Sequence, residues 1–215
     1  MSQNQTRQAD PTRERLLDEA ERLFAGKGYD AVSLREITSA AGTHLAAVNY
    51  HFGSKENLYL EVFRQRWAQR ARQIQAPLRE LAQRDSFTPE ELVRTMAKAF
   101  LAGPLTDRER MLHSQLIARE MGQQSKAFKL ISEEAMAPFM ELGIDMWRRC
   151  LPQEMDIERI KLIMLSIFAQ VLYFNFARPV VSLATGRKYD PEFVELIVEH
   201  ITRFALCGLN GNQIQ

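Results

Sequence analysis

The sequence predicts an all-α protein, and three observations support this prediction. Apolar residues recur with the period of a helix in successive segments, first along residues 16–24. Helix-start signals occur at Asp10-Pro11, Thr88-Pro89 and Asp190-Pro191, where the first residue caps the helix and proline stands where an amide would be unpaired anyway. No segment alternates between apolar and polar residues as a strand between hairpin turns does.

The same signals place the helices in order. The first helix ends at the Gly-Lys-Gly of residues 26–28, and Ser33 with Glu36 has the spacing of a capping box that begins the second. Ser54 begins a long helix that reaches Pro77 or bends there. The other expected helices are residues 34–41, 45–51, 89–102, 107–121, 125–150, 156–178 and 190–207.

The uneven helix lengths predict the domain organisation. Three short helices and the start of the long one come first, and longer, more apolar helices follow. The expected parts are a disordered N-terminal arm at 1–11, a three-helix head at 12–56, a larger C-terminal helical domain at 57–208 and a flexible tail at 209–215. The long helix joins the head to the larger domain.

The charge balance removes one simple argument for nucleic-acid binding. The 28 basic and 27 acidic residues leave a formal net charge of +1, so bulk charge does not indicate a polyanionic partner. A local basic excess remains, because residues 33–75 hold six Lys or Arg against three Asp or Glu. We interpret Arg64, Arg66, Arg70 and Arg72 as a solvated helix face, most clearly for those furthest from residue 33.

Other features favour a cytoplasmic protein without a membrane span. The N-terminal residues lack the apolar core of a signal peptide, and the two cysteines, Cys150 and Cys207, suggest no disulfide framework. The most apolar stretch, Leu162–Ala177, is shorter than a typical span and contains polar residues. We expect it to be a helix buried on most of its sides.

Residues 33–59 have the pattern of a helix-turn-helix. A capped helix meets Gly42 at a sharp turn, and a second short helix follows. Val48 and Phe52, four residues apart, would pin this second helix to the core with Phe24, Ile37 and Ala41. The spacing leaves Leu45 ambiguous between the buried and the exposed face.

The opposite face of the second helix has side chains suited to DNA. Small alanines allow close approach to the major groove, Asn49 could bond an adenine edge or a phosphate, and Tyr50 could donate to a phosphate. Lys55 begins a helix whose free amides suit a phosphate. The alternative interpretation is a solvated three-helix subdomain with an ordinary surface tyrosine. The expected DNA contacts are Ser33, Arg35, Thr43, His44, Ala46, Ala47, Asn49, Tyr50, His51 and Lys55.

The segment Ala41–Tyr59 resembles the helix-turn-helix signature of TetR/AcrR-family transcriptional regulators, and its most specific part is Tyr50–Lys55. The resemblance covers residues 12–67. The family commonly has Tyr where Asn49 stands and a polar or basic residue where Leu45 stands. Residues 88–208 resemble, more weakly, the C-terminal domain of the CecR-like branch, through Met111–Met121 and Leu162–Leu183.

The resemblance implies a homodimer that binds double-stranded operator DNA, with an apolar effector pocket in the larger domain. The sequence there is rich in Met and aromatic residues, most of which must be core. We interpret His113 and His200 as hydrogen-bonded core histidines. The candidate pocket residues are Met96, Phe100, His113, Arg119, Met136, Phe139, Met140, Trp147, Phe168 and Tyr173. The candidate interface residues are Ile167, Phe174, Phe193, Ile197, Ile201 and Phe204.

We therefore expect a sequence-specific transcriptional regulator, a dimeric repressor released from a palindromic operator by a small apolar effector. An activator or a ligand-independent DNA-binding protein is the first alternative, and a helical enzyme or binding module is the second. The sequence holds no HExxH, no GxSxG and no phosphate-binding glycine loop. We expect no catalytic activity, no metal and no cofactor.

Overall fold

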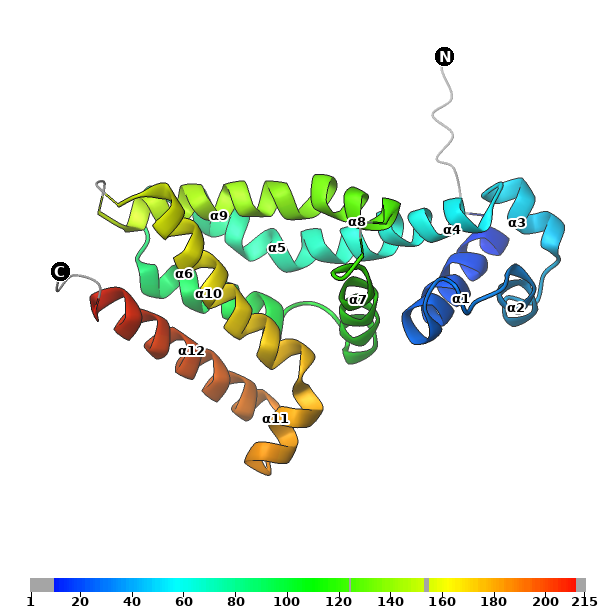
Figure 1. Cartoon of the computed structure of the whole chain (residues 1–215). Coiled ribbons are helices and arrows are strands. Elements are labelled where there is room, and N and C mark those ends of the chain that lie inside the picture. The colour runs from blue at the N-terminus through cyan, green and yellow to red at the C-terminus, as the bar shows by residue number, and fades with distance from the viewer. Residues whose placement is uncertain (1–9, 124, 153–154, 212–215) are drawn as a thin grey trace, which may run out of the picture. The chain divides into compact units, whose positions relative to one another are not determined.

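The computed structural model describes residues 10–123, 125–152 and 155–211, and within these ranges it contains helices and no strands (Figure 1). The predicted all-α class is confirmed. The helices are α1 (Pro11–Lys27), α2 (Leu34–Ala40), α3 (Leu45–His51), α4 (Lys55–Val62), α5 (Ala68–Ala82), α6 (Pro89–Leu101), α7 (Asp107–Glu120), α8 (Lys126–Ile131), α9 (Ala137–Cys150), α10 (Ile157–Phe176), α11 (Arg178–Thr185) and α12 (Pro191–Gly211). Two π-helical segments are η1 (Phe63–Trp67) and η2 (Ser132–Met136).

The chain forms two compact units. Unit 1 contains the described residues up to Arg70 together with Asp107–Glu134, and unit 2 contains Ala71–Thr106 and the described residues from Ala135. The first boundary therefore lies inside α5. Helices α7 and α8 pack in the same unit as the head expected at 12–56, which no local pattern in the sequence indicates.

Helix caps form at the predicted positions. The carboxylate of Asp10 accepts a hydrogen bond from the amide of Thr12, 2.9 Å away. Thr88 and Glu91 make a complete capping box. At Ser33 half of the predicted box forms: Ser33 accepts from the amide of Glu36, but the carboxylate of Glu36 accepts from Lys27 at 2.5 Å. These bonds satisfy amides that the first helical turn leaves without partners, so the helix starts are fixed by local chemistry.

The helix ends and breaks differ from the expectation in several places. The long helix continues through Pro77 to Ala82 rather than ending there, and α11 was not predicted. The π-helical turn η2 directly precedes α9, whose second residue is Pro138 and lacks the amide needed for the α-helical bond. Helix α1 already includes Pro11, and α12 extends to Gly211; the rest of the expected arm, 1–9, and tail, 212–215, lies outside the described residues.

Helix α1 provides much of the apolar core of unit 1. Its predicted stripe is buried from Leu16 to Phe24 on one face. The ring of Phe24 packs edge-on against Tyr59, with centroids 4.8 Å apart, and Tyr59 packs in the same way against Phe63 at 5.0 Å. The apolar periodicity of the sequence therefore identified this core correctly.

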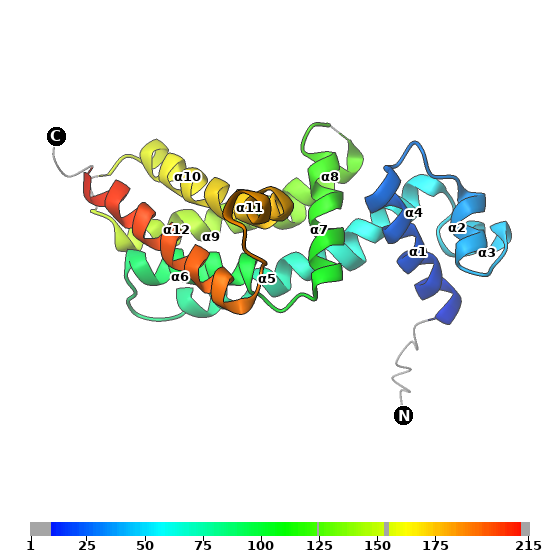
Figure 2. The same ribbon diagram turned by 90° about the horizontal axis from the view of Figure 1, so that it is seen from below.

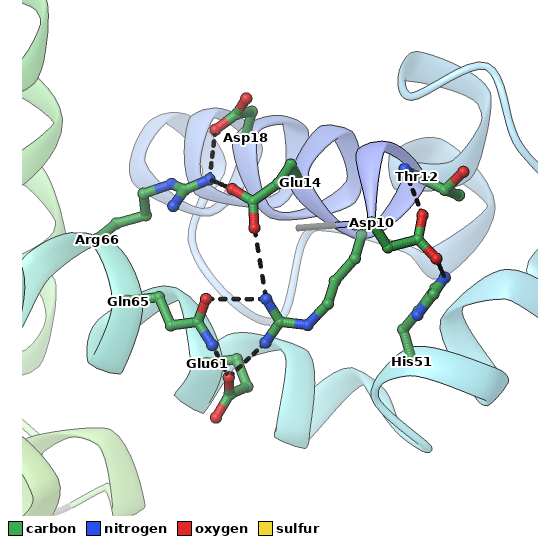
Figure 3. A network of polar contacts seen from close by, with 9 residues as sticks. Asp10, Thr12, Glu14, Asp18, His51, Glu61, Gln65 and Arg66 are labelled. Carbon is green, nitrogen blue, oxygen red and sulfur yellow. Dashed lines mark hydrogen bonds and ion pairs between the residues drawn. The ribbon is translucent and has the colours of Figure 1, made fainter. Parts of the chain in front are cut away.

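Of the four arginines interpreted as a solvated face, Arg64 and Arg72 are exposed, whereas Arg66 and Arg70 are not. Arg70 is only 8% exposed and bonds the carboxylate of Glu21, which is 3% exposed. Arg66 donates to Glu14 and Asp18 at 2.7 and 2.9 Å (Figure 3). The interpretation of Arg66 and Arg70 as solvated is wrong, because α1 carries acidic residues opposite them. Burying such charges is tolerable only when both partners are present.

The core of unit 2 is built on α6, α9, α10 and α12, and α12 packs along α6 (Figures 1 and 2). Trp147, Met146, Val198 and Ile201 are almost fully buried there. Helices α9 and α10 pack closely at Gly143, where a side chain would not fit, because a Cβ at that position would lie 2.5 Å from the sulfur of Met164. The Met-rich segments thus form a packed interior, as expected for most of them.

Helix α10 is not buried on most of its sides. Leu162, Leu165 and Tyr173 are 64, 46 and 55% exposed, so one apolar face points to solvent within the single chain. Across the described residues, no single helix has the length and apolarity to cross a membrane. Helices α10 and α11 meet those criteria only as a pair, and an 81° bend separates them.

The structure also corrects the expected dimer residues. Ile167, Phe193, Ile197 and Ile201 are buried in the core of unit 2 itself, and Phe174 packs against that core. The four buried side chains are therefore unavailable to a partner subunit, whereas Phe174 is only partly buried and stays a predicted interface residue. Of the six, Phe204 is the one that is widely exposed, at 61%.

The two helical histidines have different surroundings. His113 is buried and stacks on Trp67, with centroids 4.7 Å apart and planes inclined by 4°. His113 is therefore a core residue as predicted, but its Nδ1 atom has no hydrogen-bond partner among the described residues. His200 is exposed rather than core. Burial, with the nearby charges of Arg70 and Arg110, lowers the pKa of His113 to about 3.

We predict that His113 makes the protein less stable in acid. The unfolded imidazole takes up a proton below about pH 6.5, whereas the folded one resists protonation until about pH 3. The free energy of unfolding should therefore fall as pH drops from about 6.5 towards 3, by up to about 1.4 kcal/mol per pH unit from this residue. Urea unfolding of His113→Phe, which keeps a ring against Trp67, should show a shallower acid limb. The exposed His200→Gln variant should follow the wild type, and parallel curves for His113→Phe would contradict the prediction.

Candidate nucleic-acid interface

The turn between α2 and α3 has a defined backbone geometry. Gly42 adopts a φ of +61°, a conformation that disfavours any residue with a Cβ. The amide of Thr43 then bonds the carbonyl of Thr38 at 2.9 Å, and that of Gly42 bonds Ser39 at 3.2 Å. These bonds fix the direction in which α3 leaves the turn.

Helix α3 is anchored on one face and open on the other. Val48 is fully buried, and Phe52, the C-cap residue of α3, is only 6% exposed. Ile37 of α2 is also buried. On the opposite face Tyr50 is 84% exposed and Asn49 is also exposed. The predicted division of α3 into an anchoring and a presenting face is therefore confirmed.

The remaining expected DNA contacts differ in exposure. Ser33, Arg35, His44 and Ala46 are exposed, whereas Thr43 and Ala47 are half-buried. Leu45, which the spacing left ambiguous, lies on the exposed side with 43% of its surface accessible.

Two of the expected contacts have partners within the protein. The imidazole of His51 lies 3.6 Å from the carboxylate of Asp10 (Figure 3). The ammonium group of Lys55 lies 4.2 Å from the ring centroid of Tyr29, a cation–π geometry. His51 therefore also connects the end of α3 to the N-cap of α1. Lys55 must exchange or share its aromatic contact to reach a phosphate.

A polar network holds α1 against α3, α4 and η1 (Figure 3). Arg13 donates to Gln65 and Glu61, each at 2.9 Å, and its guanidinium lies 5.3 Å from the ring centroid of Phe52. The Thr12 amide, and more weakly the charge of His51, lower the pKa of Asp10 below its ordinary value. The network orients the helix that bears the exposed face.

Helix α7 supports the head from the other end of α1. Arg119 donates to the carbonyls of Ala25 and Gly26 at 2.9 and 2.6 Å, where the last turn of α1 leaves carbonyls unpaired. Arg119 was expected in the effector pocket, and the structure instead places its polar contacts on α1. A side chain 94 residues away in sequence makes this cap, so no local signal could have indicated it.

A buried carboxylate continues this support. Glu120, 3% exposed, accepts hydrogen bonds from the hydroxyls of Tyr59, at 2.5 Å, and Ser125. Burial, followed by the interaction with Glu120, raises the pKa of Tyr59 above its ordinary value. Sequence reasoning missed this cluster, which joins α4 to α7 and to the start of α8. A cleft of about 470 Å³ beside it is lined by Tyr29, Tyr59, Arg119, Glu120 and Lys126, among others.

The expected effector residues of unit 2 only partly come together. The rings of Phe100, Phe139 and Phe168 cluster with centroids 5.1–6.0 Å apart. Met96 and Trp147 are buried in the same core, and Met140 packs against it. Met136 is half-buried in η2, whereas Tyr173 is exposed. His113 lies in unit 1.

The core of unit 2 contains a very small cavity and a buried polar atom without a hydrogen-bond partner among the described residues. A cavity lined by Met96, Phe139 and Trp147 has a volume of only about 10 Å³, room for little more than one water molecule. On α10 the side-chain oxygen of Asn175 is buried and has no hydrogen-bond partner among the described residues. Asn175 was not among the predicted pocket residues.

Two family profiles match the chain. Residues 16–62 match the family described as bacterial regulatory proteins, tetR family. Residues 89–209 match the C-terminal domain of the HTH-type transcriptional dual regulator CecR. The first match contains the anchored α3, and the second contains the core of unit 2.

Individual relatives agree with these matches. The HTH-type transcriptional dual regulator CecR of Shigella flexneri is 28% identical over 92% of this chain and 91% of its own length. The HTH-type transcriptional regulator AcrR of the same organism is 38% identical over 63 residues, which are 29% of each protein. A TetR-like transcriptional regulator from Rhodococcus sp. RHA1 superposes with a TM-score of 0.65 at 19% identity, covering 95% of this chain and all of that one. The last comparison shows a shared fold.

We predict that Gly42→Ala weakens DNA binding through the turn. The added Cβ meets no atom within 4 Å, so its cost is backbone strain of about 1 kcal/mol at positive φ. Gly186, in unit 2, has a similar φ of +69° and equally open surroundings, which makes Gly186→Ala a matched control. Both variants should lose similar stability in urea, but only Gly42→Ala should bind DNA more weakly by fluorescence anisotropy. Equal DNA affinities would show that the turn geometry does not govern binding.

Proposed function

Because this chain belongs to the tetR family of bacterial regulatory proteins, we propose that it is a homodimeric repressor that leaves its operator when a small apolar effector binds. The family consists of DNA-binding transcriptional regulators and not of enzymes. The proposal adds the dimer, the direction of regulation and the class of effector to this family function.

One observation carries the proposal, namely the presentation of α3. A short helix held by Val48 exposes Asn49 and Tyr50, with Arg35 exposed on the preceding helix. In a helix-turn-helix the second helix enters the major groove and flanking polar groups bind phosphate. Asn49 would bond a base edge, while Tyr50, Arg35 and Lys55 would bind the backbone.

The exposed apolar face of unit 2 supports dimerisation. Leu162, Leu165 and Tyr173 on α10, with Leu196 and Phe204 on α12, are between 46 and 64% exposed. Helices α10 and α12 contact one another within the unit, so a second copy would complete a four-helix interface with two-fold symmetry. Two heads related by such an axis would bind a palindromic operator, with half-sites about 34–36 Å apart.

An apolar effector with a hydrogen-bond donor fits unit 2 better than a charged one. Phe100, Phe139 and Phe168 supply apolar walls, and the oxygen of Asn175 lacks a donor among the described residues. Asn175 follows Phe168 by seven positions on α10, which places both on one helix face. The cavity lined by Met96, Phe139 and Met164 is only about 10 Å³ and reaches neither Phe168 nor Asn175, so the effector must displace flexible side chains such as these methionines to fit. The cleft in unit 1 suits it less, because charged Arg119, Glu120 and Lys126 line it.

Release requires the effector to prefer one state of the dimer. A compound that bound equally well to both head spacings would not change operator binding. The helical run from Lys55 to Ala82 contributes residues to both units, so it is the covalent route for coupling. The relative from Shigella flexneri is named a dual regulator, so activation of some promoters by this chain is the second candidate function.

We predict distinct effects of three head variants on operator binding. The operator is first selected from a random duplex library, and affinity is then measured on it and on a scrambled duplex at two salt concentrations. Tyr50→Phe and Lys55→Ala should weaken binding to both duplexes, and Lys55→Ala should reduce the salt dependence. Asn49→Ala should cost about tenfold mainly on the operator and relax preference at one base pair. Failure to select any salt-sensitive specific site would contradict the proposed function, and equal losses for all three on both duplexes would contradict base reading by Asn49.

We also predict that effectors release the operator through unit 2. Neutral apolar compounds with one donor are screened for those that raise the unfolding temperature, and these are added to the operator complex. They should dissociate it, and Asn175→Leu should require about tenfold more compound, because an apolar residue cannot accept the bond. Asn49→Ala, which leaves unit 2 intact, should keep the same thermal stabilisation. A compound that binds without dissociating the complex would favour ligand-independent regulation.

A further inference from the structure

Leu45 is an apolar residue whose exposed position is not explained by packing within the protein. It is the first residue of α3, directly after the cap residue His44, and 43% of its surface is accessible. Single exposed apolar residues are common on protein surfaces. This one, however, stands at the start of the helix that a helix-turn-helix inserts into the groove, where side chains meet base edges.

The neighbours of Leu45 make the exposed surface of α3 unusually poor in charge. Leu45 and Asn49 are one helical turn apart, and Ala46 beside them is exposed. The helix carries no Lys, Arg, Asp or Glu, and its one basic side chain, His51, is paired with Asp10. The charged residues that distinguish guanine or cytosine are therefore absent from α3 itself.

The C5-methyl group of thymine is the largest apolar feature of the base edges in the major groove. A leucine side chain that loses water against such a methyl group gains from burial, whereas against a phosphate or a guanine edge it would leave a polar group without a partner. The chemistry of the exposed surface therefore favours thymine opposite the start of α3.

We propose that Leu45 is a specificity-determining residue that contacts thymine methyl groups in each operator half-site. The inference rests on the DNA-binding function and adds the base feature that this residue recognises. Leu45 contributes selectivity without contributing charge, so its effect does not depend on salt.

The test removes the methyl group and nothing else from the DNA. In the selected operator, each thymine pair related by the palindrome is replaced by deoxyuridine, one pair at a time, and affinity is measured by anisotropy. For the wild type, one of these paired replacements should weaken binding about fifteenfold, because each of the two lost methyl contacts costs about fourfold in affinity. Leu45→Ala should bind the thymine operator more weakly and no longer distinguish it from the uridine operator, while Leu45→Met should keep most of the distinction.

Two controls separate this effect from general damage. Met121→Ala removes another exposed apolar side chain of unit 1, 56% accessible, and should leave the uridine effect unchanged. Leu45→Lys should raise affinity for thymine and uridine operators alike and steepen the salt dependence by about one charge per subunit. Because Leu45 is exposed, unchanged circular dichroism and unfolding temperature are expected for all its variants.

The outcomes are distinct. A wild type that binds thymine and uridine operators equally at every position, or a Leu45→Ala variant that retains the full distinction, would overturn the assignment of Leu45 and leave the proposed function intact. Failure to select any specific operator would overturn both.

Discussion

A seven-residue helix in water is not stable on its own, and α3 has only seven residues. Its helical structure depends on burial of Val48 and Phe52 against the core, which also leaves the opposite side chains exposed. The packing that makes α3 helical therefore also determines which of its side chains are exposed to DNA. The N-cap bond of Ser33, the left-handed turn at Gly42 and the network of Arg13 act to hold this helix in a fixed direction.

The three-helix head is packed against and hydrogen-bonded to a helix outside the motif. The terminal carbonyls of α1 accept from Arg119, the hydroxyl of Tyr59 donates to Glu120, and the ring of Trp67 stacks on His113. All three partners lie on α7, which belongs to the same compact unit. The protein region that orients α3 is therefore larger than the segment that carries the recognisable motif.

The sequence predicted the parts of the structure that depend on local chemistry. Caps such as Asp10 and Thr88, the buried stripe from Leu16 to Phe24 and the two faces of α3 all follow from spacing along one segment. Long-range pairing was not predictable in the same way. Arg70 looks like a surface residue until Glu21 is placed beside it, and the apolar stripe of α12 looks like an interface until α6 covers it. Spacing identifies a buried face, but it does not identify the element that buries it.

The cap that Arg119 places on α1 has a consequence for the order of folding. During synthesis, α1 to α4 leave the ribosome before α7 exists, so the last turn of α1 is open until about 90 further residues have followed. Contacts of such high sequence separation close late, because the loop entropy between them must be overcome first. A fragment ending near Arg70 would contain the whole motif and still lack this closure. We therefore expect the head of such a fragment to be less stable than the head of the whole chain, because it lacks the contacts from α7.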